Sequence, residues 1–414
     1  MKNKIPLYGI CEWDDYFAGK GINQVENITD EFDSQLEKHV ASGFNNIVWA
    51  LGRATLSYWS EFNEIHQPAS TPKTHILGHL AMKEFCPLRR AIDWGRKGNI
   101  PIWGRLCMNR FYMPGQEFRS TFAENHPEYC QIMHDGKKDY TRLSYAIPEF
   151  RKERCDILLE AQRIGVDALV LDFCRQPPMT GYHEDELKDY TEKTGKDPRR
   201  LQGHNHEIFT EWFSSRAQCV TTFMRELRTS VAEQEQKYNR KCPIVIRIPA
   251  SSNWLLLAAG IDLNSWYKEN LFDIVMLSPL LWSANDMTHH FEHHVNTAHL
   301  NSKKIIGGIG SLNVIPQQIT NINQPHGSFE EQPIWNMAYR QLNAGVDGMS
   351  VYQTDTICNV AWLKSIIPHL GTIGICAEKR LEWPRLRLNS LLTGCDWHSN
   401  YDYGLNGTGT RFVL

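Results

Sequence analysis

The feature that most constrains this 414-residue chain is a unit that recurs along it. In each unit a helical pattern is followed by a short break, often at glycine, and then by an apolar run that ends in polar or aromatic residues. Glycine just after a helix is typical of a C-terminal cap, and a continuous apolar run is typical of a buried parallel strand. Eight runs fit: Leu7–Trp13, Ile47–Leu51, Ile100–Leu106, Ala168–Phe173, Ile244–Ile248, Ile274–Leu277, Ile305–Ile309 and Met349–Tyr352.

Eight strands that alternate with helices predict the α/β class and a closed (β/α)8 TIM barrel. The rival is a doubly wound open sheet, which loses its main support because no G-x-G-x-x-G follows the first strand. Long loop insertions are expected after strand three, at Phe111–Ala146, and after strand four, at Gln176–Asn205; loops of this length are more often functional than filler. We assign residues 1–375 to the catalytic barrel and 376–414 to a short C-terminal extension packed on it.

Composition narrows the functional class. The hydrophobic content of 42% suffices for a large core, and the net charge of −3 gives no electrostatic case for binding nucleic acid or a membrane surface. No apolar run approaches about 18 residues, so no membrane span is expected. The 11 cysteines are scattered without a C-x-x-C pair, which favours reduced thiols and a cytoplasmic location. No cofactor is predicted, and a homo-oligomer is compatible with the sequence.

The candidate site is centred on the stretch Gly165–Arg175. An ionisable carboxyl group at the end of an apolar run, as at Asp172, is costly unless it is paired or used. The carboxyl ends of barrel strands build the active site, so Asp172 and Arg175 are the leading candidates. The other strand ends add Glu12, Asp14, Asp15, Arg105, Asn109, Arg247, Ser278, Tyr352, Gln353 and Asp355.

Carboxyl, guanidinium and aromatic groups around one pocket suit the cleavage of glycosidic bonds. That reaction needs one carboxylic acid to protonate the leaving oxygen and a second group as base or nucleophile, while aromatic rings stack on sugar faces. Three arginines, Arg105, Arg175 and Arg247, favour an acidic sugar such as a sialic or uronic acid, because the guanidinium fork binds carboxylate bidentately. A carbohydrate substrate is therefore predicted.

Several of these signals have a structural interpretation as well. Asp172 could pair with an arginine for stability alone. Asp167 and Asp347 stand at strand beginnings, on the stability face of a barrel, and we interpret both as structural. His290 and His294 lie one helical turn apart, which is ligand spacing, but no H-E-x-x-H is present. A solvated helix face is the preferred interpretation, and no metal is predicted.

The chain also resembles a known family between about Leu7 and Asp355. The segments that carry the resemblance are His126-Pro127-Glu128-Tyr129, Asp135-Gly136-Lys137, Leu143-Ser144-Tyr145-Ala146, Pro148-Glu149-Phe150-Arg151, Gly165-Val166-Asp167, Leu171-Asp172-Phe173-Cys174-Arg175, Phe223-Met224-Arg225, Arg247-Ile248-Pro249, Gly260-Ile261-Asp262 and Trp266. They resemble the glycosyl-hydrolase-like TIM-barrel proteins labelled family 10-like. This resemblance implies O-glycosyl hydrolysis with Asp172 in the site.

The chain departs from that family at strand four. Many members carry two adjacent acids there, whereas Asp172 is followed by Phe173 and then Arg175. An arginine at this place is similar to inverting sialidases on a related barrel, which use a strand-one carboxylate with a loop histidine. Asp14 and His134 match those residue types.

The main hypothesis is thus an exo-acting glycosidase of acidic sugars. In it Asp14 and His134 activate water and transfer protons, and Asp172 orients the site or acts as a second acid. The substrate contacts are Glu12, Arg105, Asn109, Arg175, Arg247, Tyr352, Gln353 and Asp355. Three alternatives stay open: hydrolysis of neutral glycosides by Asp172 with Asp355 or Glu12, a non-catalytic carbohydrate-binding barrel, and a metal-dependent hydrolase that uses His290 and His294.

Overall fold

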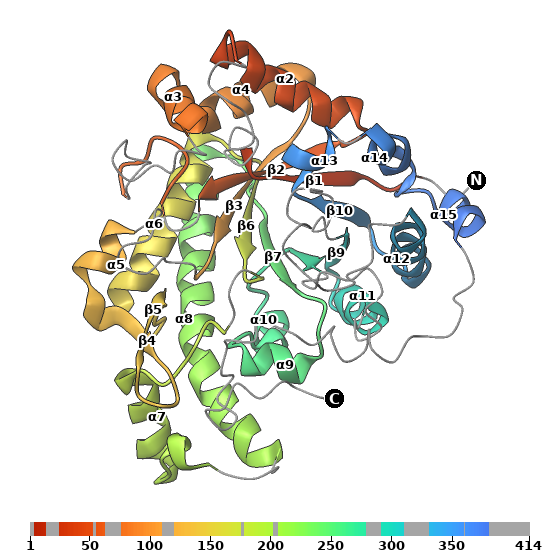
Figure 1. Cartoon of the computed structure of the whole chain (residues 1–414). Helices are drawn as coiled ribbons and strands as arrows, with labels where there is room; N and C mark the ends of the chain where they lie inside the picture. The colour runs from red at the N-terminus through yellow and green to blue at the C-terminus, as the bar shows by residue number, and fades with distance from the viewer. Residues whose placement is uncertain are drawn as a thin grey trace, which may run out of the picture.

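In the computed structural model of the chain, eight parallel strands close into a barrel in chain order, with the last strand pairing with the first (Figure 1). The described residues are 4–13, 25–52, 55–62, 76–109, 120–174, 178–201, 206–278, 291–309, 331–359 and 361–380. The barrel strands are β1 (Leu7–Cys11), β2 (Asn46–Gly52), β3 (Ile102–Cys107), β6 (Ala168–Asp172), β7 (Ile244–Pro249), β8 (Ile274–Ser278), β9 (Lys304–Ile309) and β10 (Gly348–Tyr352). The predicted (β/α)8 barrel is confirmed.

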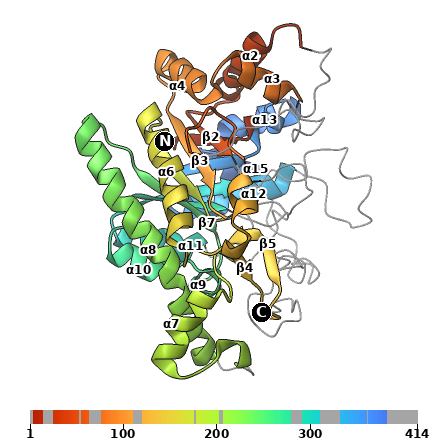
Figure 2. The same ribbon diagram turned by 90° about the vertical axis from the view of Figure 1, so that its left-hand side faces the viewer.

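Helices surround the barrel (Figures 1 and 2). Local signals set their ends: Asn27 caps α2 by accepting hydrogen bonds from the amides of Thr29 and Asp30, and Gly165 ends α6 with a φ of +128°. Among the described residues, none of the helices is both long and apolar enough to cross a membrane. The outer helices are α2 (Ile28–Ala41), α3 (Ile76–Glu84), α4 (Pro87–Gly98), α6 (Pro148–Ile164), α8 (His206–Tyr238), α9 (Asn253–Ala258), α10 (Leu263–Lys268), α11 (Phe291–Leu300), α12 (Glu331–Ala344), α13 (Thr354–Ile357), α14 (Ala361–Ile366) and α15 (Ile373–Lys379).

The core has two parts because successive strand residues point to opposite faces of the sheet. The larger part lies between the strands and the helices, where Leu169 and Leu171 of β6 pack outward. The smaller part fills the barrel interior. Its members are Ile10, Val48, Trp103, Ala168, Val170, Val245, Ile274, Met276, Ile306 and Tyr352. The interior is therefore packed with apolar side chains below the ends of the strands.

The amino-terminal face of the barrel is held by one interaction that occurs four times. In each case the residue just before one barrel strand accepts a hydrogen bond from an amide at the start of the preceding barrel strand. The amides of Leu7, Ile102, Ile244 and Ile305 donate to Asn45, Asp167, Asp273 and Asp347, at 3.0, 2.8, 2.8 and 2.8 Å. Asp167 and Asp347 thus make the structural contacts that the sequence predicts for strand beginnings.

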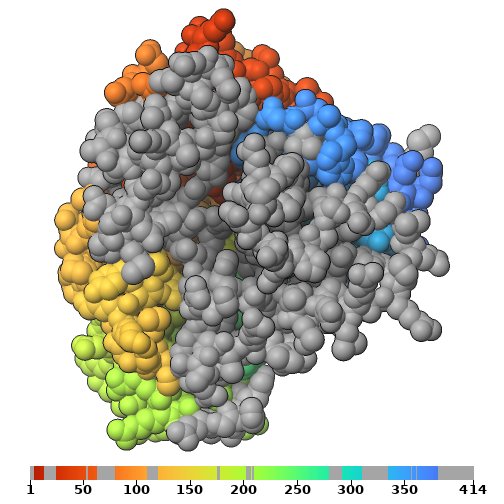
Figure 3. Space-filling view, in the orientation of Figure 1, coloured from red at the N-terminus to blue at the C-terminus, as the bar shows by residue number. Residues whose placement is uncertain are grey.

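The two insertions pack against each other beside the barrel. The one after β3, expected to be a loop, contains α5 (Thr121–Asn125) and an antiparallel hairpin of β4 (Cys130–Ile132) and β5 (Lys138–Leu143). The one after β6 contains α7 (Glu184–Thr194), which lies next to the hairpin in both ribbon views and along the edge of the space-filling view (Figures 1, 2 and 3). Buried Glu186 joins them, since its carboxylate accepts from Gln131, Ser144 and the amide of Gly181, each at 2.8 Å.

The C-terminal division of the chain stays a prediction. Helix α15 spans the expected boundary between residues 375 and 376, and it packs against α12. Residues 381–414, most of the expected extension, lie outside the described residues.

Candidate active site

The carboxyl ends of six strands bring polar and ionisable side chains into one buried group. The strand register explains this: Asp172 on β6 stands opposite Arg247 on β7, and Ile10 on β1 stands opposite Tyr352 on β10. Glu12 follows Ile10 by two residues, and so points the same way. We define the rim cluster as Glu12, Arg105, Asp172, Arg247, Ser278, Tyr352 and Asp355, all with side chains in the buried class.

Asp172 lies between two arginines. Its Oδ2 accepts from Nη1 of Arg105 at 2.5 Å, and Nη1 of Arg247 donates to Oδ1 and Oδ2 at 2.8 and 3.0 Å. The amide of Cys174 also donates to Oδ1, at 3.0 Å. Hydrogen bonds from cationic donors favour an ionised carboxylate. Asp172 is therefore a fixed anion that sets the orientation of both guanidinium groups.

Glu12 joins the other side of the cluster. Its Oε1 accepts from Nη2 of Arg105 at 2.8 Å and also from the hydroxyl of Tyr352. Its backbone amide donates to Oδ1 of Asp355 at 3.1 Å, so the residue that follows β1 is joined to α13. Arg105 is thereby shared between Glu12 and Asp172 across the barrel mouth.

The electrostatics of the cluster keep its arginines charged. Burial disfavours the charged form of Arg105, but the carboxylates of Glu12 and Asp172 outweigh it and hold the pKa of Arg105 well above its ordinary value. The Tyr352 ring lies 4.8 Å from the guanidinium carbon of Arg247, and Nη2 of Arg247 donates to Ser278 Oγ at 2.7 Å. The Nε atoms of both arginines are buried, and among the described residues neither has a hydrogen-bond partner.

The described rim cluster contains more carboxyl groups than guanidinium groups. It holds two guanidinium groups and three carboxyl groups, and both guanidinium groups bond to carboxylates within it. Such a set can present fixed anions, a proton donor or acceptor and a tyrosine hydroxyl to a ligand. Within the described cluster, both guanidinium groups are already paired with carboxylates.

Asn109, which is expected to contact substrate, makes hydrogen bonds to both insertions. Its Oδ1 accepts from the amide of Leu143 at 3.0 Å, while its Nδ2 donates to the carbonyl groups of Leu143 and Met179 at 3.1 and 3.3 Å. Both amide hydrogens are thus used by backbone. This geometry makes Asn109 a positioning residue that fixes the hairpin and the second insertion to the end of β3.

His134 and Gln353 are two further predicted site residues that do not belong to the rim cluster. His134 sits in the turn of the β4–β5 hairpin, where its ring packs on Tyr182 and its Nε2 hydrogen-bonds the carbonyl of Arg199 at 2.9 Å. These contacts link the two insertions. Gln353 directly follows β10 with a φ of +56°, a left-handed conformation that is uncommon for a residue with a side chain and that recurs at functional sites.

Some predicted residues lie outside the described part of the chain: Asp14, Asp15, Arg175 and His290.

His294 is the partner of His290 in the metal alternative, and it was expected to lie on a solvated helix face. It is buried, and its Nε2 hydrogen-bonds the carbonyl of Ser251 at 2.7 Å. Within the described ranges, no three His, Cys, Asp or Glu side chains are placed to hold a metal ion.

A residue that the sequence reasoning missed supports the rim cluster from outside. His39 on α2 is buried; its Nδ1 donates to the carbonyl of Gln35 at 2.7 Å, and its Nε2 hydrogen-bonds Thr354 Oγ1 at 2.8 Å. Thr354 begins α13, which carries Asp355. Burial lowers the pKa of His39 to about 4, so the ring is neutral at pH 7. No local signal in the sequence of α2 indicates this contact.

The fold recurs among solved structures, although no protein-family profile and no curated protein matches the chain. The chain is similar to the catalytic domain of a β-amylase from Paenibacillus polymyxa, with 8% identity, 90% of this chain and 98% of that one covered, and a TM-score of 0.55. It is also similar to a β-galactosidase from Halorubrum lacusprofundi, with 10% identity, 83% and 56% covered, and a TM-score of 0.53. At these identities the likeness shows the TIM-barrel fold.

Proposed function

We propose that this protein is a glycoside hydrolase whose chemistry takes place at the rim cluster. The observation that carries the proposal is the burial of Glu12, Asp172 and Asp355 together with two arginines and a tyrosine at the carboxyl ends of the barrel strands. Active sites of this fold lie at that end. Two of the proteins with similar barrels are glycosidases. This likeness of fold agrees with the proposal but does not identify the reaction.

The contacts favour Glu12 and Asp355 for the two carboxyl roles of glycoside hydrolysis. One carboxylic acid must give a proton to the leaving oxygen, and a second group must act as base or nucleophile. Asp172, held by two arginines, suits the role of a fixed anion that orients them. The alternative assignment to Asp14 and His134 places the chemistry on the end of strand one and on the hairpin turn.

We further propose a neutral sugar as the substrate. The acidic-sugar hypothesis depended on guanidinium groups that could meet a carboxylate of the substrate. Of its three arginines, Arg175 lies outside the described residues. Arg105 bonds to Glu12 and Asp172, and Arg247 bonds to Asp172, so at these two an anionic sugar would have to compete with those carboxylates. The β-amylase and β-galactosidase to which the fold is similar are named for neutral sugars, in agreement with this choice.

A panel of 4-nitrophenyl glycosides tests the proposal: glucosides, galactosides and N-acetylglucosaminides in both anomers, with a glucuronide and a sialoside. We expect release of nitrophenol from a neutral glycoside, and its loss in Asp355→Asn but not in Asp14→Asn. Release from the sialoside or glucuronide alone, with loss in Asp14→Asn, would establish the acidic-sugar assignment instead. Glycan binding without release from any substrate would indicate the non-catalytic barrel.

A further inference from the structure

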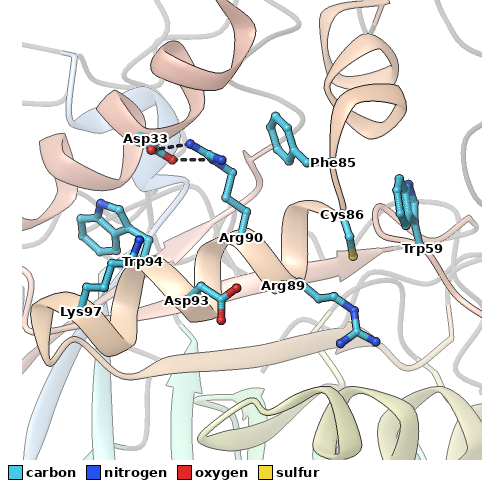
Figure 4. A pocket seen from close by; sticks show the side chains of 9 residues that line it. All are labelled: Asp33, Trp59, Phe85, Cys86, Arg89, Arg90, Asp93, Trp94 and Lys97. Atoms are coloured by element: carbon cyan, nitrogen blue, oxygen red, sulfur yellow. Dashed lines mark hydrogen bonds and ion pairs between the residues drawn. The ribbon is translucent and has the colours of Figure 1, made fainter.

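Two cavities lie side by side along α4, and no residue of the rim cluster lines either of them. The first, of about 440 Å³, runs along α4 and includes Trp59, Trp94 and Lys97 (Figure 4). The second, of about 410 Å³, extends to α6 and includes Glu160 and Arg163. Both are lined by Trp59 and by Arg89, so these two side chains form the divide between them.

Trp59 is exposed and yet firmly held. Its side chain is 50% exposed, while its Nε1 donates to the carbonyl of Met82 at 2.7 Å. The residues on either side are anchored to the carboxylate of Glu160, which is only 3% exposed: Tyr58 and Ser60 donate their hydroxyls at 2.7 and 2.6 Å. A ring fixed in this way loses little conformational entropy when a ligand stacks on it.

Arg89 supplies the polar counterpart to that ring. It is exposed, and no hydrogen bond or ion pair joins it to another described residue. Two other arginines that line the cavities are already paired. Arg90 makes a bidentate pair with Asp33 at 2.8 and 2.6 Å, and Arg163 bonds to Glu61 at 2.9 Å. Figure 4 shows Arg89 directed away from the Asp33–Arg90 pair, on the same side as Trp59. Its donors are thus available to a ligand on the indole ring.

An indole face beside a guanidinium group and carboxylates matches the chemistry of a sugar. The C–H face of a pyranose stacks on the ring, and its hydroxyls accept from Arg89. A protein partner fits less well, because a specific interface buries about 800 Å² per partner. The large apolar side chains exposed on this segment are Trp59 and Phe62, and the others are dispersed over the described surface.

We propose that the two cavities bind neighbouring units of a neutral oligosaccharide across Trp59 and Arg89, as a second carbohydrate site outside the barrel mouth. The choice of sugar rests on the proposed glycosidase function, since such a site would hold a polymeric substrate on the enzyme. Binding here uses no rim residue, so the two functions can fail separately.

Affinity electrophoresis of the full chain tests this in gels that contain amylopectin, glycol chitin or galactomannan. We expect retardation in at least one gel, with the apparent affinity falling about tenfold in Trp59→Ala and in Arg89→Ala. Arg89 is an exposed helix residue, and alanine there preserves the helix, so this variant keeps the test valid if Trp59→Ala disturbs its segment. The matched control is Trp362→Ala on α14, which removes a 38% exposed tryptophan elsewhere and should be retarded like the wild type.

Turnover of a small 4-nitrophenyl glycoside separates this site from the rim cluster. Trp59→Ala and Arg89→Ala should hydrolyse it at the wild-type rate. Retardation that is lost in both variants, in a protein that hydrolyses none of the glycosides, would sustain the surface site and reject the proposed function. Equal retardation of Arg89→Ala and wild type, or no retardation in any of the gels, would overturn the surface site.

Discussion

Asp167 and Asp172 stand at opposite ends of the β6 region and show how position decides what a carboxylate does. At the base of the barrel, Asp167 accepts a hydrogen bond from the neutral amide of Ile102 at 2.8 Å. At the rim, Asp172 bonds to two guanidinium groups in a fully buried setting. The base needs an acceptor of the right shape, whereas the rim needs a negative charge. The same substitution at the two ends should therefore have different consequences.

The largest expected effect on stability is that of Asp172→Asn. Asparagine keeps the shape but removes the charge that balances Arg105 and Arg247, and breaking a buried ion pair costs about 3–5 kcal/mol. Urea denaturation of wild type and variant measures the difference in the free energy of unfolding. Asp167→Asn is the matched control: its amide oxygen can still accept from Ile102, so we expect less than about 1 kcal/mol. Equal losses in the two variants would remove the contrast between base and rim.

A pH dependence of smaller size comes from His39, which supports the rim through Thr354. Its folded pKa is lowered to about 4 by burial, from the 6.5 of the unfolded chain. Between these values the unfolded state binds the proton more readily, so stability is complete above pH 6.5 and falls as the pH drops towards 4, by an amount on the order of 3 kcal/mol.

Urea unfolding of wild type and His39→Gln at several pH values between 7 and 4 isolates this contribution, because glutamine does not titrate in that range. The wild type should lose stability more steeply than the variant. Parallel curves for the two proteins would show that His39 does not carry the effect.

The smallest effect is expected at the base. Asp167→Ala removes the acceptor for the Ile102 amide, at a cost of about 1–2 kcal/mol in the free energy of unfolding. Turnover by the correctly folded protein should not change, because this contact lies at the opposite end of the barrel from the rim cluster. A lowered kcat with an unchanged unfolding transition would contradict the division of roles.

The sequence predicted the barrel and the end at which its polar groups gather. Parallel strands place their carboxyl ends on one rim, so Asp172 and Arg247 could be brought together from strand order alone, and the register bears this out. The pairing of Arg105 with Glu12 could not, since it crosses the barrel mouth. This pairing is what weakens the case for an acidic sugar.

Contacts made by the insertions were also beyond local reasoning. The predicted substrate contact of Asn109 stays a prediction, but its partners within the protein, backbone groups of Leu143 and Met179, are brought to it only by the folded hairpin and second insertion. His39 was missed for the same reason, because its partner Thr354 is supplied by the far end of the chain. In both cases tertiary packing decides the role of a polar side chain.

The central claim is that the rim cluster performs glycoside hydrolysis, and kcat for Glu12→Gln on the aryl glycoside that the wild type cleaves tests it most directly. Glutamine retains an acceptor for Arg105 and Tyr352 but removes the charge that pairs with Arg105, so the thermal midpoint should fall, and kcat is compared at a temperature at which the variant is still folded. We predict a fall in kcat of about 10²–10⁴-fold, the range for general acid–base catalysis. A kcat close to that of the wild type in a correctly folded variant would contradict the account.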